Sequence, residues 1–419
     1  MINVELSGVW NCISLPDLLG RESELFDAHL YLRSNQPEKP GFLGFLGQSD
    51  SLTARMLHSV ERAAEDIRAQ ADTLVVVGNC GAADAARAAL RLFAQASGVT
   101  VLFTGDHLSS RRFLQLCDRL EGHDFCMHLI CPAGGCEELL ASRALRWMLE
   151  RRYGQSAAKH IFVSAPADSA AARMAQEEQY TLLPMPSEPG GLWSGLTSAA
   201  FLPMAAAGPE PLSVLEGAAE AYSAYDLRAF ENPVWMYVGA RQCLLERGRS
   251  TELLGTFEPD MEPFGRWWRR YFTRHALPGG SGCLPVHVPF WQDADLLDAP
   301  VCAGRSDLFE TYLRVPSMAR RRVNVEMDWR DYDGLGYLAG RTLQDVEQAS
   351  FAALLESRDD AGAPAVVLET EEMTPGVLGE LLYFFELAGA LSGALCGADP
   401  FEQPPLPTRI LAKNALENL

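Results

Sequence analysis

Three cysteines stand on loops that directly follow predicted strands, and a thiolate can serve as a nucleophile or as a metal ligand. Cys80 follows an apolar run at 73–77, and Cys131 and Cys136 follow another at 125–130. Because ligands of open α/β sheets bind at the carboxyl ends of the strands, we expect the three thiols at one ligand-binding edge. A helix N-terminus nearby would lower the pKa of such thiols.

Two interpretations of these thiols are open. Together with His128 or Glu137, Cys80, Cys131 and Cys136 would offer ligand types that suit zinc. The four-residue gap between Cys131 and Cys136 does not match a known zinc motif, so the three are only weak metal candidates. We favour the second interpretation, in which they are small buried residues that fill space.

A basic segment at 269–275 holds three arginines and one histidine near the end of a predicted helix. Arginine forks of this kind bind anionic ligands. The same side chains would also suit a solvated helix face, or ion pairs with acidic residues such as Asp293 and Asp295. The sequence leaves the anion-binding and the structural interpretation open.

The cysteines and the basic segment are positioned by apolar strands that alternate with helices along the chain. In the first half of the chain the pattern predicts strands at 73–77, 99–103, 125–130, 160–164 and 180–184. Buried strands separated by helices are typical of a parallel sheet that is covered on both faces.

A second α/β unit follows a helical stretch at 194–224. Its strands are predicted at 251–257, 308–315, 323–327 and 365–369, and its helices at 233–246, 343–356 and 374–395. The last of these helices contains Glu380 and Glu386, whose charges would be costly in lipid. We therefore expect a buried core helix there and no membrane span.

The chain of 419 residues has a net charge of −20, from 55 acidic and 35 basic residues. Because such an acidic surface repels a phosphate backbone, we do not expect the protein to bind nucleic acid. Ten cysteines are too sparse for a disulfide scaffold. Residues 1–6 lack the basic and apolar regions of a signal peptide, and we expect a cytoplasmic protein with reduced thiols and no membrane partner.

Ordered blocks along the chain resemble one family. They lie at 41–46, 74–81, 264–268, 308–311, 334–340, 378–386 and 399–404. In this order they resemble the bacterial phosphoglucose isomerases, the glucose-6-phosphate isomerase family, which have two sugar-isomerase domains.

The resemblance implies an α/β fold of two tandem doubly wound parallel-sheet sugar-isomerase domains with a helical C-terminal arm. We expect an N-terminal helical segment at 1–50 that packs on the second domain. The first domain is expected at 51–210, the second at 211–395 and the arm at 396–419. The resemblance also implies a dimer that interconverts glucose 6-phosphate and fructose 6-phosphate through an enediol, with no metal or other cofactor.

The family's phosphate-binding motifs are altered in this chain. Ala82 stands in place of a serine in the first glycine turn, and the phosphate loop at 131–138 has lost every hydroxyl. Glu137 replaces a phosphate-binding threonine, and its carboxylate would satisfy the helix dipole and repel a dianion. We expect the pocket to be lined by Gly78, Cys80, Gly81, Ala82, Cys131, Gly134, Gly135, Cys136, Glu137, Gly190, Gly191, Ser194, Arg270, Arg274 and Gln403.

The family's catalytic positions are also replaced. Leu192 stands for the arginine that offsets enediol charge, and such a loss typically costs about 10²–10³ in rate. Arg274 stands for the base glutamate, and an arginine stays protonated and cannot abstract a proton. Asp295 replaces the ring-opening histidine, and Ile410 replaces the lysine. The sequence therefore supports no catalytic assignment.

The sequence favours three candidate functions, in the following order. The first is an isomerase homologue that has lost its activity and serves as a binding or regulatory partner, as a homodimer or as a heterodimer with an active paralogue. The second is an enzyme that acts on another sugar-like or anionic small molecule in the same pocket. The third is a divergent, active glucose-6-phosphate isomerase.

Overall fold

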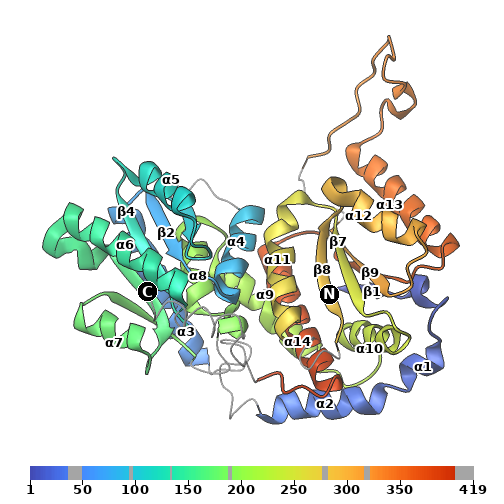
Figure 1. Ribbon diagram of the computed structural model, residues 1–419, viewed down its shortest axis with the longest axis horizontal. Helices are drawn as coiled ribbons and strands as arrows, with labels where there is room; N and C mark the ends of the chain where they lie inside the picture. Colours follow the sequence, from blue (N-terminus) through green and yellow to red (C-terminus); the bar gives the residue numbers. More distant parts are fainter. Residues whose placement is uncertain are drawn as a thin grey trace.

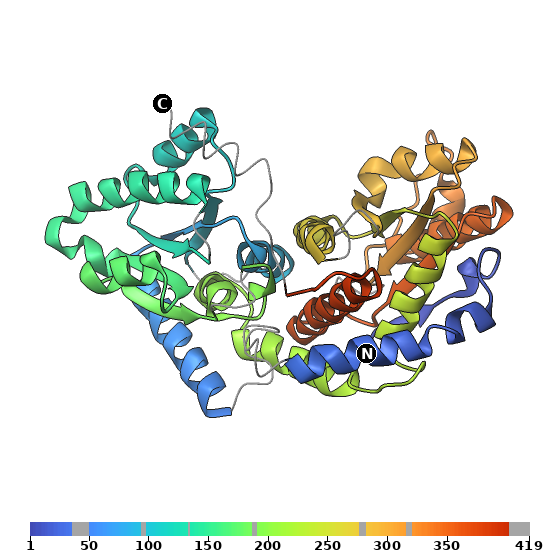
Figure 2. The ribbon, with the colours of Figure 1, turned by 60° about the horizontal axis from the view of Figure 1, so that its bottom comes forward.

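Two α/β units lie side by side in the computed structural model, each built around its own sheet (Figures 1 and 2). The structure describes residues 1–35, 50–93, 98–132, 135–186, 191–275, 282–315 and 321–401. The strand order and the parallel pairing confirm the predicted fold class. Gly134, Gly190, Gln403, Ile410 and most of the expected C-terminal arm lie outside the described residues.

The first sheet is entirely parallel and has the order β3-β2-β4-β5-β6. Its strands are β2 (Thr73–Val77), β3 (Thr100–Thr104), β4 (Phe125–Ile130), β5 (Ile161–Pro166) and β6 (Thr181–Met185). Every residue of β2, β4 and β5 is buried, which explains their unbroken apolar sequences. The flanking helices are α3 (Asp50–Gln70), α4 (Gly81–Phe93), α5 (Ser110–Leu120), α6 (Cys136–Tyr153), α7 (Ala170–Glu177) and α8 (Ser198–Ala207).

The second sheet has the order β1-β10-β9-β7-β8, with β1 antiparallel to its neighbour. Its strands are β1 (Asn3–Glu5), β7 (Thr251–Thr256), β8 (Leu284–Pro289), β9 (Leu308–Arg314) and β10 (Ala365–Glu369). Its helices are α1 (Leu15–Leu19), α2 (Glu22–Asn35), α9 (Pro211–Ala224), α10 (Pro233–Glu246), α11 (Glu262–His275), α12 (Phe290–Cys302), α13 (Leu343–Asp360) and α14 (Pro375–Leu395). Helices α1 and α2 pack on α10, and α2 also packs on α14.

The predicted strand at 323–327 is wrong. Residue Asn324 forms only an isolated bridge with Thr342, and the surrounding segment is largely exposed. In Figure 1 this part of the chain projects from the body as a narrow orange arm above α13. Its apolar residues therefore do not enter a sheet, although their alternation is typical of a strand.

Helix α14 is a core helix. By length and composition it is the one helix among the described residues that would suit a membrane span, but 89% of its apolar window is buried inside the protein. Glycines bring it into close contact with α9: a Cβ on Gly379 would lie 1.8 Å from the Val214 carbonyl oxygen. The helix is apolar because protein surrounds it.

Helices α4 and α11 pack against each other and join the two units (Figure 2). The double tryptophan of α11, Trp267 and Trp268, is fully buried in this region. The face of α11 that meets α4 carries arginines, and these form ion pairs at the candidate site.

Candidate functional site

The candidate site lies at the carboxyl ends of β2 and β4. The chain leaves β2 toward β3 on one side, while β4 lies on the other side, so the strand order reverses between them. Such a switch point is the usual ligand-binding edge of an open α/β sheet. Gly78 at the end of β2 permits close packing there, because a Cβ would lie only 3.1 Å from the Cβ of Ile130.

The N-terminus of α6 is capped by its own glutamate. Glu138 is buried, and its Oε2 accepts a hydrogen bond from the Gly135 N–H at 2.6 Å. Its Oε1 accepts another from the Asn79 N–H at 2.9 Å. One carboxylate therefore connects the two loops of the switch point. The N–H groups of Asn79 and Gly135 donate to it and are not available to an anion.

The N-terminus of α4 is capped in a similar way. The Ala82 N–H donates to the Ser194 hydroxyl at 2.9 Å, and Ser194 is buried in the short turn η3 (Gly191–Ser194). The structure thus brings the predicted pocket residues Ala82, Gly135 and Ser194 to one edge. Side chains of the protein already hold backbone donors at both helix N-termini of this edge.

The cysteines are largely buried here. Cys80 and Cys131 are buried and Cys136 is half-buried at the first position of α6. Desolvation raises the pKa of Cys80 to about 11, which disfavours a reactive thiolate. Within the described ranges no group of three or more His, Cys, Asp or Glu residues is placed to hold a metal ion.

His128 does not join the cysteines as a ligand. Its Nε2 lies 2.8 Å from the Ser164 hydroxyl, inside the sheet between β4 and β5. Burial lowers the pKa of this imidazole to about 3, so it is neutral at physiological pH. The hydrogen bond with Ser164 gives His128 a structural role.

Arg270 takes part in a buried ion-pair network. Its Nε donates to Asp84 at 2.6 Å, and one Nη donates to the Asn79 side-chain oxygen, also at 2.6 Å. Arg266 and Arg87 contact the other Asp84 oxygen at 3.2 and 3.0 Å. Because Asp84 is fully buried and lies on α4, this network connects the first unit to α11 of the second.

The network continues to Asp106 at the end of β3. Arg87 and Arg266 each bond its Oδ2, at 3.0 and 3.1 Å. Burial raises the pKa of Asp106, but the charges of these arginines outweigh that effect and lower it overall. For Arg270 and its neighbours the structure thus favours ion pairs over an open anion site.

Sequence reasoning missed Asp84, Arg87, Asp106 and Arg266. The spacing of Asp84 and Arg87 on one helix indicates an ion pair, but it gives no hint of the partners on α11. The arginines of α11 are 160 or more positions in sequence from their aspartate partners, and only the tertiary fold shows that they meet.

Those remaining family positions that the structure describes bring no catalytic groups together. Arg274 lies half-buried in the last turn of α11, and Asp295 is exposed on α12. Leu192 lies in η3. Asp293 is also exposed, and Arg270 pairs with Asp84 and not with either of the α12 aspartates.

Glu386 of α14 is a buried carboxyl close to this edge. A Cβ on Gly195, just after η3, would lie 3.1 Å from its Oε1 and 3.6 Å from the Trp267 indole nitrogen. Neither carboxyl oxygen of Glu386 has a hydrogen-bond partner among the described residues. Desolvation raises its pKa to about 8, so the group is mostly protonated at neutral pH.

An open cavity of about 830 Å³ adjoins the network on the side of β3. Arg87, Asp106 and Arg266 of the network line it, and so do Arg112 and Arg119 of α5. Positive side chains outnumber negative ones there, in contrast to the chain as a whole.

The architecture defines the class of protein. Two doubly wound units packed through α4 and α11 form the fold of the two-domain sugar isomerases. The structure aligns with a glucose-6-phosphate isomerase from Chlamydia trachomatis at a TM-score of 0.76 and 14% identity, covering 100% of this chain and 88% of that one. A hypothetical protein from Thermus thermophilus aligns at a TM-score of 0.84 and 21% identity, covering 99% and 100%.

Sequence comparison places the chain within this class. It is 32% identical over 402 residues to a protein named glucose-6-phosphate isomerase from Alkaliphilus metalliredigens, covering 93% of this chain and 89% of the relative. A relative of the same name from Symbiobacterium thermophilum is 33% identical over 392 residues, covering 90% and 87%. No family model matches the chain. The chain belongs to the glucose-6-phosphate isomerase family.

Proposed function

We propose that this member of the family no longer interconverts glucose 6-phosphate and fructose 6-phosphate and serves as a binding or regulatory homologue. The observation that carries the proposal is the phosphate loop at 131–138, which has no hydroxyl side chain and places the carboxylate of Glu137 in the first turn of α6. A carboxylate at this helix N-terminus satisfies the helix dipole itself and repels a dianion. With the loop hydroxyls lost, no hydroxyl of this loop can compensate for that repulsion.

The carboxylates near this edge are also poor candidates for the base that isomerisation requires. Glu138 is held by backbone N–H groups, and Asp84 is surrounded by arginines. Glu386 has a pKa suited to proton transfer, but its side chain is fully buried and a sugar cannot reach it. A general base must come within about 3 Å of the proton that it removes.

A coupled assay of fructose 6-phosphate isomerisation tests this proposal. The purified, metal-stripped protein is expected to show no rate above background, while the Alkaliphilus relative, assayed in parallel, serves as the positive control. Isothermal titration with fructose 6-phosphate is expected to show no binding at the β2/β4 edge. A kcat of about 1–10³ per second would overturn the proposal.

A second candidate function is the binding or turnover of another anionic small molecule. The cavity beside β3 favours it, because Arg112 and Arg119 line the cavity outside the Asp84–Asp106 network. Titration with citrate and with inorganic phosphate tests this candidate. R112Q should weaken binding at least tenfold, whereas R111Q, an exposed neighbour outside the cavity, should not.

We also propose that the protein forms a dimer, with a second copy of the chain as the partner. The projecting arm supports this, since Met327, Trp329, Tyr332 and Tyr337 are 77%, 82%, 84% and 76% exposed. Exposed apolar groups gathered on one segment are typical of protein–protein contacts. We expect light scattering to give a dimer mass for the wild-type chain.

The double variant W329S/Y332S is expected to shift the mass to that of a monomer. W147S is the matched control, because Trp147 is also exposed but lies on α6, away from the arm. A monomeric wild-type chain, or a dimer that survives the double variant, would contradict the proposal. Association only with an added active isomerase would point to a heterodimer instead.

A further inference from the structure

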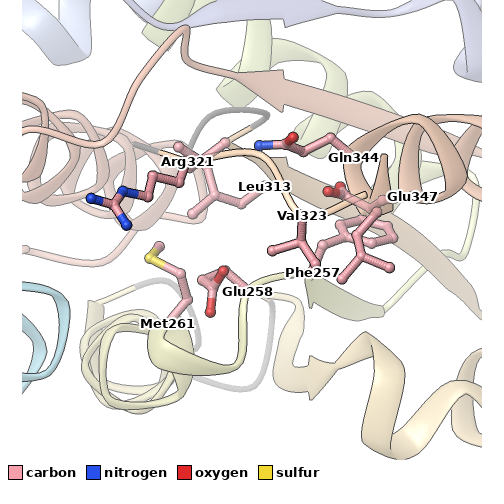
Figure 3. A pocket seen from close by; sticks show the side chains of 10 residues that line it. Phe257, Glu258, Met261, Leu313, Arg321, Val323, Gln344 and Glu347 are labelled. Carbon is pink, nitrogen blue, oxygen red and sulfur yellow. The ribbon is translucent and has the colours of Figure 1, made fainter. Parts of the chain in front are cut away.

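A second cavity lies in the other unit, at the carboxyl ends of β7 and β9. It encloses about 220 Å³, and Figure 3 shows the side chains around it. Phe257 and Glu258 follow β7, Leu313 comes from the end of β9, and Gln344 and Glu347 come from the first turns of α13. None of these residues belongs to the candidate site described above.

This cavity occupies the same kind of position in the second sheet as the candidate site does in the first. The chain leaves β7 through α11 to reach β8 on one side, while β9 and β10 lie on the other side. The cavity therefore occupies the switch point of the second sheet, where open α/β sheets bind ligands. It adjoins the start of α11 at Met261, whereas Arg270 is about two turns further along that helix, roughly 12 Å by helical rise.

The polar groups of the cavity are mainly acceptors. Glu258 and Glu347 each place a carboxylate on its wall, and within the described part of the chain only Glu347 has an ion-pair partner, Arg314 at 3.6 Å. Gln344 Oε1 is buried and has no hydrogen-bond partner among the described residues. Burial raises the pKa of Glu258, and the negative charges of Asp260 and Glu347 raise it further.

Arg321, the one cation among the described lining residues, does not offset this excess. Arg321 is exposed, and in Figure 3 it lies at the opposite end of the cavity from Glu347. Among the described residues no ion pair joins Arg321 to Glu258. A buried acceptor without a donor is costly, and a ligand that brings a donor removes that cost.

The rest of the wall is apolar. Phe257, Met261, Leu313 and Val323 surround the polar groups (Figure 3). The cavity is smaller than the 300–1,000 Å³ typical of sites for drug-sized ligands. Its occupant must therefore be small, with an apolar body and a head that donates hydrogen bonds.

We propose that this cavity is a binding site for a small organic ammonium ion, with its head between Glu258 and Gln344 and its apolar body against Phe257 and Met261. An ammonium group has three donors and no acceptor, which matches a wall of carboxylate and amide oxygens. A carboxylate or phosphate ligand would meet two like charges there. The inference does not depend on the proposed function, because the site lies in the other unit.

Isobutylamine is a suitable probe, with isobutanol and isovalerate as neutral and anionic counterparts of similar shape. Ligand-observed NMR titration of the full chain at pH 7 should show isobutylammonium binding at least tenfold more tightly than either counterpart. E258Q should weaken this binding at least tenfold. V323W, which fills the cavity from a different wall, should abolish it.

E262Q is the matched control: the same change four residues away, on an exposed residue outside the cavity lining. It should leave the affinity unchanged, and circular dichroism should confirm that all three variants fold. No binding of isobutylammonium at 10 mM would overturn the proposal. Equal or tighter binding of isovalerate, or full affinity in E258Q, would overturn it as well.

Discussion

At the scale of single residues, Glu386 couples stability to pH. Desolvation raises its pKa to about 8 from the ordinary value of 4.5, since the buried carboxyl has no hydrogen-bond partner among the described residues. Below pH 4.5 the group is protonated in both the folded and the unfolded state. Between pH 4.5 and 8 only the unfolded state releases the proton, so ionisation favours unfolding.

We therefore expect Glu386 to lower the free energy of unfolding by about 1.4 kcal/mol for each pH unit over this range. E386Q keeps the shape and removes the titration, so the stability of the variant relative to wild type should rise from pH 5 to pH 8. Urea unfolding at pH 5, 6.5 and 8 measures the difference. E220Q, on an exposed residue of α9, should show no such trend; a constant difference for E386Q would contradict the expectation.

At the scale of secondary-structure elements, the contact between α9 and α14 depends on glycine. A Cβ on Gly379 would lie 1.8 Å from the Val214 carbonyl oxygen, closer than any real contact. G379A should therefore push the two helices apart and lower stability by about 1–3 kcal/mol, even though alanine is the better helix former. Thermal unfolding followed by circular dichroism measures the effect.

Gly376, on the same helix, is the control for this prediction. A Cβ there would meet nothing closer than 3.6 Å, which is ordinary contact. G376A should thus be neutral or slightly stabilising, because alanine loses less backbone entropy on folding. If both variants lose the same stability, the close approach of the helices is not the cause.

The elements also show what the sequence can predict. The central strands β2 and β4 match their predicted ranges, because each is a continuous apolar run buried on both faces. The edge strands β1 and β8 were not predicted from the sequence. Strand β1 has only three residues, and β8 contains Pro285 and Pro289, which are tolerated only where a strand has a free edge or an end.

The candidate site, too, could be predicted only in part from the sequence. The absence of loop hydroxyls and the replacement of the base by Arg274 are visible in the sequence alone. The Glu138 cap across two loops depends on the folding of the first unit, and the pairing of Asp84 with Arg266 forms only when the two units dock. Spacing along one helix gives no information on such partners.

At the scale of the whole molecule, Asp84 joins the two units. Its carboxylate is fully buried among Arg87, Arg266 and Arg270. D84N should leave these guanidiniums without their shared counter-charge and cost about 3–5 kcal/mol, as for other buried pairs from which one partner is removed. Calorimetry should also show the units unfolding in separate steps, since α4 and α11 would be less firmly joined.

D27N provides the matched control, because Asp27 is exposed on α2. Its effect should stay within about 0.5 kcal/mol of wild type. A D84N protein as stable as D27N would show that the network contributes nothing to the docking of the units.

The antiparallel edge strand β1 has a consequence for biosynthesis. Residue Glu5 pairs with Val367, and the whole first sheet lies between them in the chain. On a ribosome that adds about 5–20 residues per second, β1 emerges roughly 20–70 seconds before its partner. During translation the first unit can fold as soon as it is made, while the start of the chain must wait, unpaired, until the second sheet is nearly complete.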